Sequence, residues 1–102
     1  MIHSLAFITA HPGRRDDLMA AWCANAPAVR AEEGCVEYVA TIDFPEAGPF
    51  QTPVGPDTIV IFEKWASIEA LRAHVVAPHM KAYAEKTRDL VAGRVIRTMT
   101  PF

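Results

Sequence analysis

Two histidines in the second half of the chain, His74 and His79, are the residues best suited to acid–base chemistry. Histidine ordinarily changes charge between about pH 5 and 8, so it can accept or donate a proton at neutral pH. Pro78 is typical of a first helical turn, which places His79 at the positive end of a helix, where a neutral, proton-accepting ring is favoured. We therefore rank His79 first as a proton acceptor and His74 second, with a purely structural role as the alternative for both.

The sequence does not predict a metal or redox cofactor. His74 and His79 are five residues apart and separated by Pro78, so they do not share one helical face as a metal-binding pair does, and a third ligand is missing. Cys23 and Cys35 form no C-x-x-C pair, and no glycine-rich dinucleotide fingerprint is present. Any oxidation would then have to draw its electrons from the substrate.

Aromatic and polar side chains near these histidines would form the walls of a small-molecule site. Trp65 ends a predicted strand and offers a flat face and one N–H donor, and Glu63 shares its strand face. A buried Glu63 needs a partner, such as Arg97 or a histidine. The other candidate substrate-binding residues are Tyr83, Met80, Asn25, Trp22, Phe7, Phe62 and His3. The alternative for this aromatic set is simple core packing, and His3 would face either the pocket or a subunit interface.

Hydrophobic alternation and helical spacing predict the elements that position these residues. Strands are expected at Ile2–Ala10, 36–43, Thr58–Trp65 and 94–100. Helices are expected at about 14–31, with a kink at Pro27, from the Ser67 N-cap to about 76, and at 79–92, with Gly93 as the stop. Residues 44–57 contain four prolines and form a long loop, expected to frame the pocket or the dimer.

The order strand, helix, strand, strand, helices, strand predicts a single α+β domain over residues 1–102, with a ferredoxin-like split βαβ fold and a four-stranded antiparallel sheet. Hydrophobic residues make up 51% of the chain and charged residues 22%, which is more apolar material than a small monomer hides easily. Two sheets packed face to face in a homodimer, as a dimeric α+β barrel, would cover the bare sheet face.

Charge and hydropathy exclude several classes of partner. The net charge is −2 without a basic cluster, so a nucleic-acid surface is not predicted, and the acidic pair Glu32-Glu33 is interpreted as a solvated helix end. No apolar stretch is long enough to span a membrane, and no signal peptide is apparent. Two cysteines without disulfide spacing are typical of a cytoplasmic protein.

Several motifs are recognisable along the chain: EGC at residues 33–35, EKWASIEAL at 63–71, His74, and PHMKAY at 78–83. Together they resemble the antibiotic biosynthesis monooxygenase (ABM) family, and the resemblance extends over the whole chain. The loop through FQT at 50–52 and PDTIV at 56–60 is similar to that of bacterial quinol monooxygenases. The resemblance implies a homodimer without cofactor that oxidises a quinol or polyphenolic aromatic with O2. Haem-degrading relatives also resemble the chain at Trp65, but their iron ligand and strand asparagine correspond here to Ala84 and Ala6.

Two other functions remain open from the sequence. One is a non-catalytic dimeric barrel that binds small aromatics. The other is a cofactor-free isomerase in which His79 or His74 shuttles a proton without O2.

Overall fold

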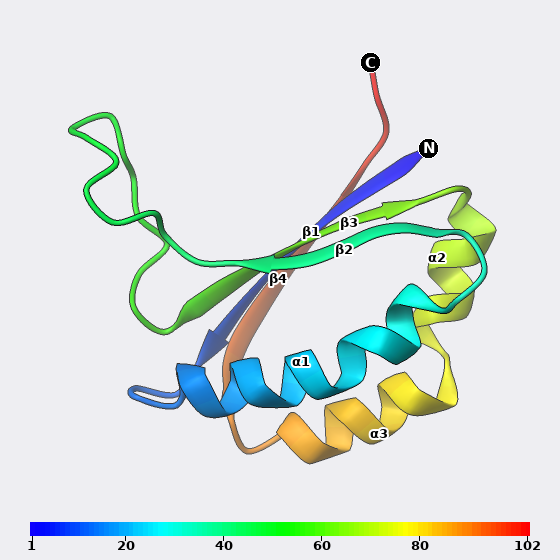
Figure 1. The fold of residues 1–102 in the computed structure, drawn as a ribbon, viewed down its shortest axis with the longest axis horizontal. Coiled ribbons are helices and arrows are strands. Elements are labelled where there is room, and N and C mark those ends of the chain that lie inside the picture. The colour runs from blue at the N-terminus through cyan, green and yellow to red at the C-terminus, as the bar shows by residue number, and fades with distance from the viewer.

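One antiparallel sheet covered on one face by three helices makes up the whole chain, and the computed structural model describes all residues 1–102 (Figure 1). The elements in chain order are β1 (Ile2–Ala10), α1 (Arg15–Arg30), β2 (Cys35–Thr41), β3 (Thr58–Trp65), α2 (Ile68–Val75), α3 (Pro78–Thr87) and β4 (Val91–Met99). The strand order is β2-β3-β1-β4, with every neighbouring pair antiparallel. The predicted α+β, ferredoxin-like fold is therefore confirmed.

The two faces of the sheet are separated by the alternation along β1. Ser4 and Ala6 lie opposite Glu63 and Ile61 of β3, and these four side chains are buried. We call this helix-covered side the inner face. Leu5 and the other odd-numbered residues of β1 lie on the opposite side, the outer face, on which no helix packs. A shift of one residue in this register would exchange the two faces, so the burial pattern fixes the pairing.

The hydrophobic core lies between the inner face and α1. Leu18, Trp22 and Val29 recur at helical spacing on α1 and pack against Ile59 and other strand residues. Burying a side chain of this kind contributes about 1.5–3 kcal/mol each, so this stripe fixes α1 on the sheet. Pro27 lies inside α1 but does not end it, and the helix continues to Arg30.

The last helix ends earlier than the sequence predicts. We expected a helix over 79–92 with Gly93 as its stop, but α3 ends at Thr87 and Gly93 lies within β4, opposite Thr9. The Thr87 hydroxyl donates to the Tyr83 carbonyl, and the Leu90 amide closes a turn on the Thr87 carbonyl. Pairing with β1 begins at Val91, so strand pairing overrides the local helical propensity.

The loop between β2 and β3 projects from the end of the sheet that is opposite to α2 (Figure 1). Its base is held by Asp43, whose carboxylate accepts hydrogen bonds from the amides of Val54 and Gly55, both at 3.0 Å. These two bonds lower the pKa of Asp43. As for the helices, none of them has the length and apolar character that crossing a membrane requires.

Candidate active site

A cavity of about 250 Å³ lies between the inner face of the sheet and the helices α2 and α3. Most of its wall is apolar, which suits a small aromatic molecule. Its polar residues are Ser4, Tyr38, Glu63, His74, Tyr83, Thr87, Arg94 and Thr98. No residue of the loop 44–57 is part of this wall, so the predicted framing of the pocket by the loop is not seen within one chain. The outer face carries a larger hollow of about 510 Å³, but it is more open and contains neither His74 nor His79.

His74 is brought into the cavity wall by α2. The Ser67 hydroxyl accepts a hydrogen bond from the Ala70 amide at 3.1 Å and caps the helix, as predicted. Leu71 and His74, one helical turn apart, are both buried against the sheet. The His74 ring lies 4.7 Å from the Trp65 ring and 5.9 Å from the Tyr38 ring, centroid to centroid. Aromatic contacts on two sides therefore fix the orientation of the imidazole.

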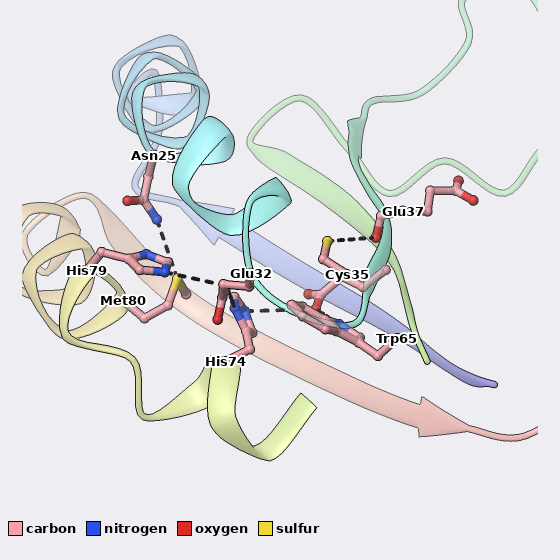
Figure 2. Close-up of polar contacts among 9 residues, drawn as sticks. Asn25, Glu32, Cys35, Glu37, Trp65, His74, His79 and Met80 are labelled. Atoms are coloured by element: carbon pink, nitrogen blue, oxygen red, sulfur yellow. Dashed lines mark hydrogen bonds and ion pairs between the residues drawn. The ribbon is translucent and has the colours of Figure 1, made fainter. Parts of the chain in front are cut away.

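The Oε2 oxygen of Glu32 lies 2.7 Å from the Nδ1 atom of His74, within hydrogen-bonding distance (Figure 2). Only 5% of the His74 side chain and 17% of the Glu32 side chain is exposed. An ionised carboxylate has no hydrogen to donate, so His74 must donate from Nδ1. In the neutral ring this leaves Nε2 unprotonated and able to accept a proton.

Gly34 explains why Glu32 reaches His74. Its φ angle is +84°, a conformation that favours glycine, and a Cβ added there would lie 2.5 Å from the Ala70 Cβ. The Gly34 carbonyl also accepts a hydrogen bond from the Ala66 amide at 2.8 Å. The turn between α1 and β2 therefore packs directly on the start of α2, which brings Glu32 to His74.

The interpretation of the Glu32-Glu33 pair as a solvated helix end is right for Glu33, which is exposed, and wrong for Glu32. Glu32 is the candidate site residue that sequence reasoning missed. The only signal in the sequence is the glycine that follows, because a tight turn at Gly34 predicts a close approach of another element. That signal does not say which of the two carboxylates turns inward.

Glu63 is a second buried carboxyl group beside His74. Its Oε1 accepts a hydrogen bond from the Trp65 Nε1 at 2.9 Å and lies 4.0 Å from the His74 Nε2. Burial raises the pKa of Glu63, while the Trp65 hydrogen bond and His74 partly oppose the rise. Of the two partners suggested by the sequence, the histidine is present. Arg97 is not, because it pairs with Leu5 on the outer face.

Trp65 does not line the cavity. Its side chain is fully buried, its ring packs on His74 and its N–H is bound by Glu63. The structure therefore shows the core-packing alternative for Trp65, in which its side chain holds His74 and Glu63 in place.

His79 lies beside Glu32, in the groove between α1 and α3, and not in the cavity wall (Figure 2). Its Nε2 is 3.4 Å from the Glu32 Oε2, but neither ring nitrogen makes a well-formed hydrogen bond. Asn25 lies in the same groove and donates to the Met80 sulfur at 3.4 Å. By position, the structure reverses our ranking of the two histidines, since His74 lines the cavity, whereas His79 does not and lies near His74 through their shared neighbour Glu32.

The remaining sequence candidates fall into three places. Met80 and Tyr83 line the cavity. Trp22 is buried and stacks on Tyr38, with ring centroids 5.0 Å apart. The candidates that the strand alternation places on the outer face, away from the cavity, are His3, Phe7 and Phe62.

A metal-binding cluster is not formed by the side chains of the site. No group of three or more His, Cys, Asp or Glu residues is arranged to hold a metal ion. Ala6 and Ala84, at the positions where the haem-degrading relatives carry their asparagine and iron ligand, both line the cavity. Their methyl groups offer no ligand to iron.

Comparison with known proteins agrees with this architecture. Residues 1–86 match the family described as antibiotic biosynthesis monooxygenase. The Escherichia coli K12 protein named "Probable quinol monooxygenase YgiN" is 37% identical over 103 residues, covering 99% of this chain and 98% of that protein. The crystal structure of PA3566 from Pseudomonas aeruginosa has a TM-score of 0.82 at 23% identity, covering 99% of this chain and 93% of that chain. Rv0793 from Mycobacterium tuberculosis has a TM-score of 0.80 at 24% identity, covering 99% and 94%. These two structures share the fold, and the chain belongs to the antibiotic biosynthesis monooxygenase family.

Proposed function

We propose that this chain is a cofactor-independent monooxygenase that oxidises a quinol or another polyphenolic aromatic with O2, with His74 as the proton acceptor. The observation that carries the proposal is the buried His74 imidazole in the cavity wall, bound through Nδ1 by Glu32 at 2.7 Å. Membership of a monooxygenase family and the name of the Escherichia coli relative support the reaction class.

The chemistry requires a base because a neutral phenol gives up an electron to O2 poorly. A phenol hydroxyl has a pKa of about 10, so most of it is protonated at neutral pH. When His74 takes this proton, the Glu32 carboxylate stabilises the imidazolium that forms. The phenolate can then transfer one electron to O2, and the semiquinone and superoxide combine to form a C–O bond. Loss of water leaves a hydroxylated quinone, so the quinol itself supplies all the electrons.

Oxygen consumption by the purified, chelator-treated protein tests this proposal across a panel of reduced quinones and catechols. General-base catalysis typically accelerates a reaction about a hundred- to ten-thousand-fold, so His74→Ala should lose most of the enzymatic rate. His11→Ala, in an exposed turn, is the matched control and should keep it. Full activity in His74→Ala would exclude His74 as the base.

Assays of product formation and of binding, with the same panel of compounds, separate the other two functions. Product formation under nitrogen would indicate an isomerase in which His74 shuttles the proton. Binding of aromatics without any product, in air or under nitrogen, would indicate a non-catalytic barrel.

We also propose that the outer face of the sheet is covered by a second copy of the chain in a homodimer. Large apolar side chains are exposed there, including Phe62 at 44% and Val95 at 48%. Two such sheets packed face to face would bury them. Sedimentation should give twice the monomer mass of 11.2 kDa, and Phe62→Lys should shift the protein towards monomer. Val76→Lys, at an exposed site after α2, is the control. A wild-type monomer at micromolar concentration would refute this assembly.

A further inference from the structure

The cavity has two polar ends of different chemistry. At one end Ser4 of β1 lies opposite both Glu63 of β3 and Thr98 of β4, and this is the end that contains His74. At the other end Ile8 lies opposite Arg94, and Tyr83 of α3 reaches the same wall. Ile8 lies four positions after Ser4 along the strand, which corresponds to about 13 Å at about 3.3 Å per residue.

Arg94 is a free cation at this second end. Its guanidinium makes no ion pair within 4.0 Å and no hydrogen bond, whereas Arg14, Arg30 and Arg88 are all engaged. Arg15, Arg72 and Arg97 are also unpaired, but Arg94 is the only arginine that lines the cavity. The side chain is exposed, so it stands at the opening of the cavity over β4. Ile96, two residues further along β4 and also part of the cavity wall, is open to solvent as well, at 57% exposed.

Tyr83 adds a neutral donor beside Arg94. Tyr83 and Arg94 both line this cavity. Burial raises the pKa of the Tyr83 phenol, and the positive charge of Arg94 partly opposes the rise. The Tyr83 hydroxyl makes no side-chain hydrogen bond with the rest of the chain, as only its backbone carbonyl is engaged. A guanidinium and a phenol O–H with unused donors are suited to a carboxylate oxygen.

We infer that Arg94 and Tyr83 form a subsite for an anionic group, so that the preferred ligand is a hydroxylated aromatic carboxylate. Its hydroxyl lies at His74, its carboxylate lies at Arg94, and its ring plane occupies the apolar section between them, next to Ala6, Ile61 and Met80. The two ends of the cavity, at Ser4 and Ile8, are about 13 Å apart along β1, and the length of the Arg94 side chain shortens the distance that a ligand must span. An aromatic system of a few fused rings fits this distance. The assignment of the hydroxyl to His74 rests on the proposed function, while the anion subsite stands on the Arg94 end alone.

The test is a binding measurement that needs no turnover. Under nitrogen, titration calorimetry compares 6-hydroxy-2-naphthoate, which carries a hydroxyl and a carboxylate at opposite ends, with its neutral carboxamide. Wild-type protein should bind the carboxylate about tenfold more tightly, since a charged hydrogen bond is weakened by solvent at an exposed arginine. Arg94→Gln should abolish this preference and leave carboxamide binding unchanged. Added salt should reduce the wild-type preference.

Arg97→Gln is the matched control, because it removes the same charge from the same strand but on the outer face. It should keep the preference for the carboxylate. Equal affinities of the two ligands for wild-type protein, equal effects of the two variants, or no binding of either ligand would each overturn the subsite. An Arg94-dependent preference in a protein that consumes no O2 with any quinol would refute the proposed reaction and leave the subsite standing. Oxygen uptake that depends on His74, without an Arg94-dependent preference for the carboxylate, would refute the subsite and leave the proposed reaction standing.

Discussion

Replacing Glu32 with glutamine tests whether the carboxylate beside His74 acts in proton transfer. The substitution keeps the size of the side chain and removes its charge. The Glu32–His74 hydrogen bond is 2.7 Å long, and its partners are 17% and 5% exposed, so solvent screens it little. Hydrogen bonds to charged groups contribute about 1.5–3 kcal/mol. If that stabilisation develops as His74 takes up the proton, its loss slows turnover about 10- to 150-fold, at 1.36 kcal/mol per factor of ten.

Steady-state oxygen uptake measures this effect, and Glu33→Gln is the control, since Glu33 is the exposed neighbour with the same charge. We expect Glu33→Gln to stay within about twofold of wild type, as surface substitutions usually have small effects. In a His74→Ala background, Glu32→Gln should have little further effect, because residues that act as a unit are not additive. Equal rates in the two single variants would refute the reasoning. So would a Glu32→Gln effect of undiminished size in the double variant, since it would not act through His74.

Two further changes test how the site is built. Gly34→Ala should lower the free energy of unfolding by about 1–2 kcal/mol for its φ of +84° and about 1–3 kcal/mol for the clash with Ala70. Urea unfolding measures this, and a neutral result would mean that the turn does not pack closely on α2. Glu63→Gln tests the buried carboxyl group, whose pKa is raised by burial. A raised folded-state pKa means that the fold holds this proton more tightly than the unfolded chain, so the contribution of Glu63 to stability is lost as pH rises from about 4.5 through the raised value. The Glu63→Gln variant should therefore gain stability relative to wild type as pH rises through that range. A difference in unfolding free energy that stays constant from pH 4 to 8 would contradict the raised pKa of Glu63.

The sequence alone determined the elements and the two faces of the sheet. The alternation in Ile2–Ala10 is a local property of a strand, because neighbouring side chains point to opposite faces. Ser67 as a helix cap and the placement of His74 one turn after Leu71 are equally local, and both predictions are confirmed. The predicted start of the last strand was less accurate, since pairing of β4 with β1 outweighs the helical propensity of the residues up to Gly93.

The tertiary structure decided which side chains meet. His74 and Glu32 are 42 positions apart, and nothing in the sequence distinguishes Glu32 from Glu33. The sequence left both substrate stacking and core packing open for Trp65, and in the structure its N–H donates to Glu63 and its ring packs on His74. His79 and His74 are near each other in the chain, yet only His74 faces the cavity. Helical and strand periodicity fix the direction of each side chain within its own element. The partner that it finds depends on how the turn at Gly34 and the helices pack on the sheet, and that packing is set by contacts between distant parts of the chain.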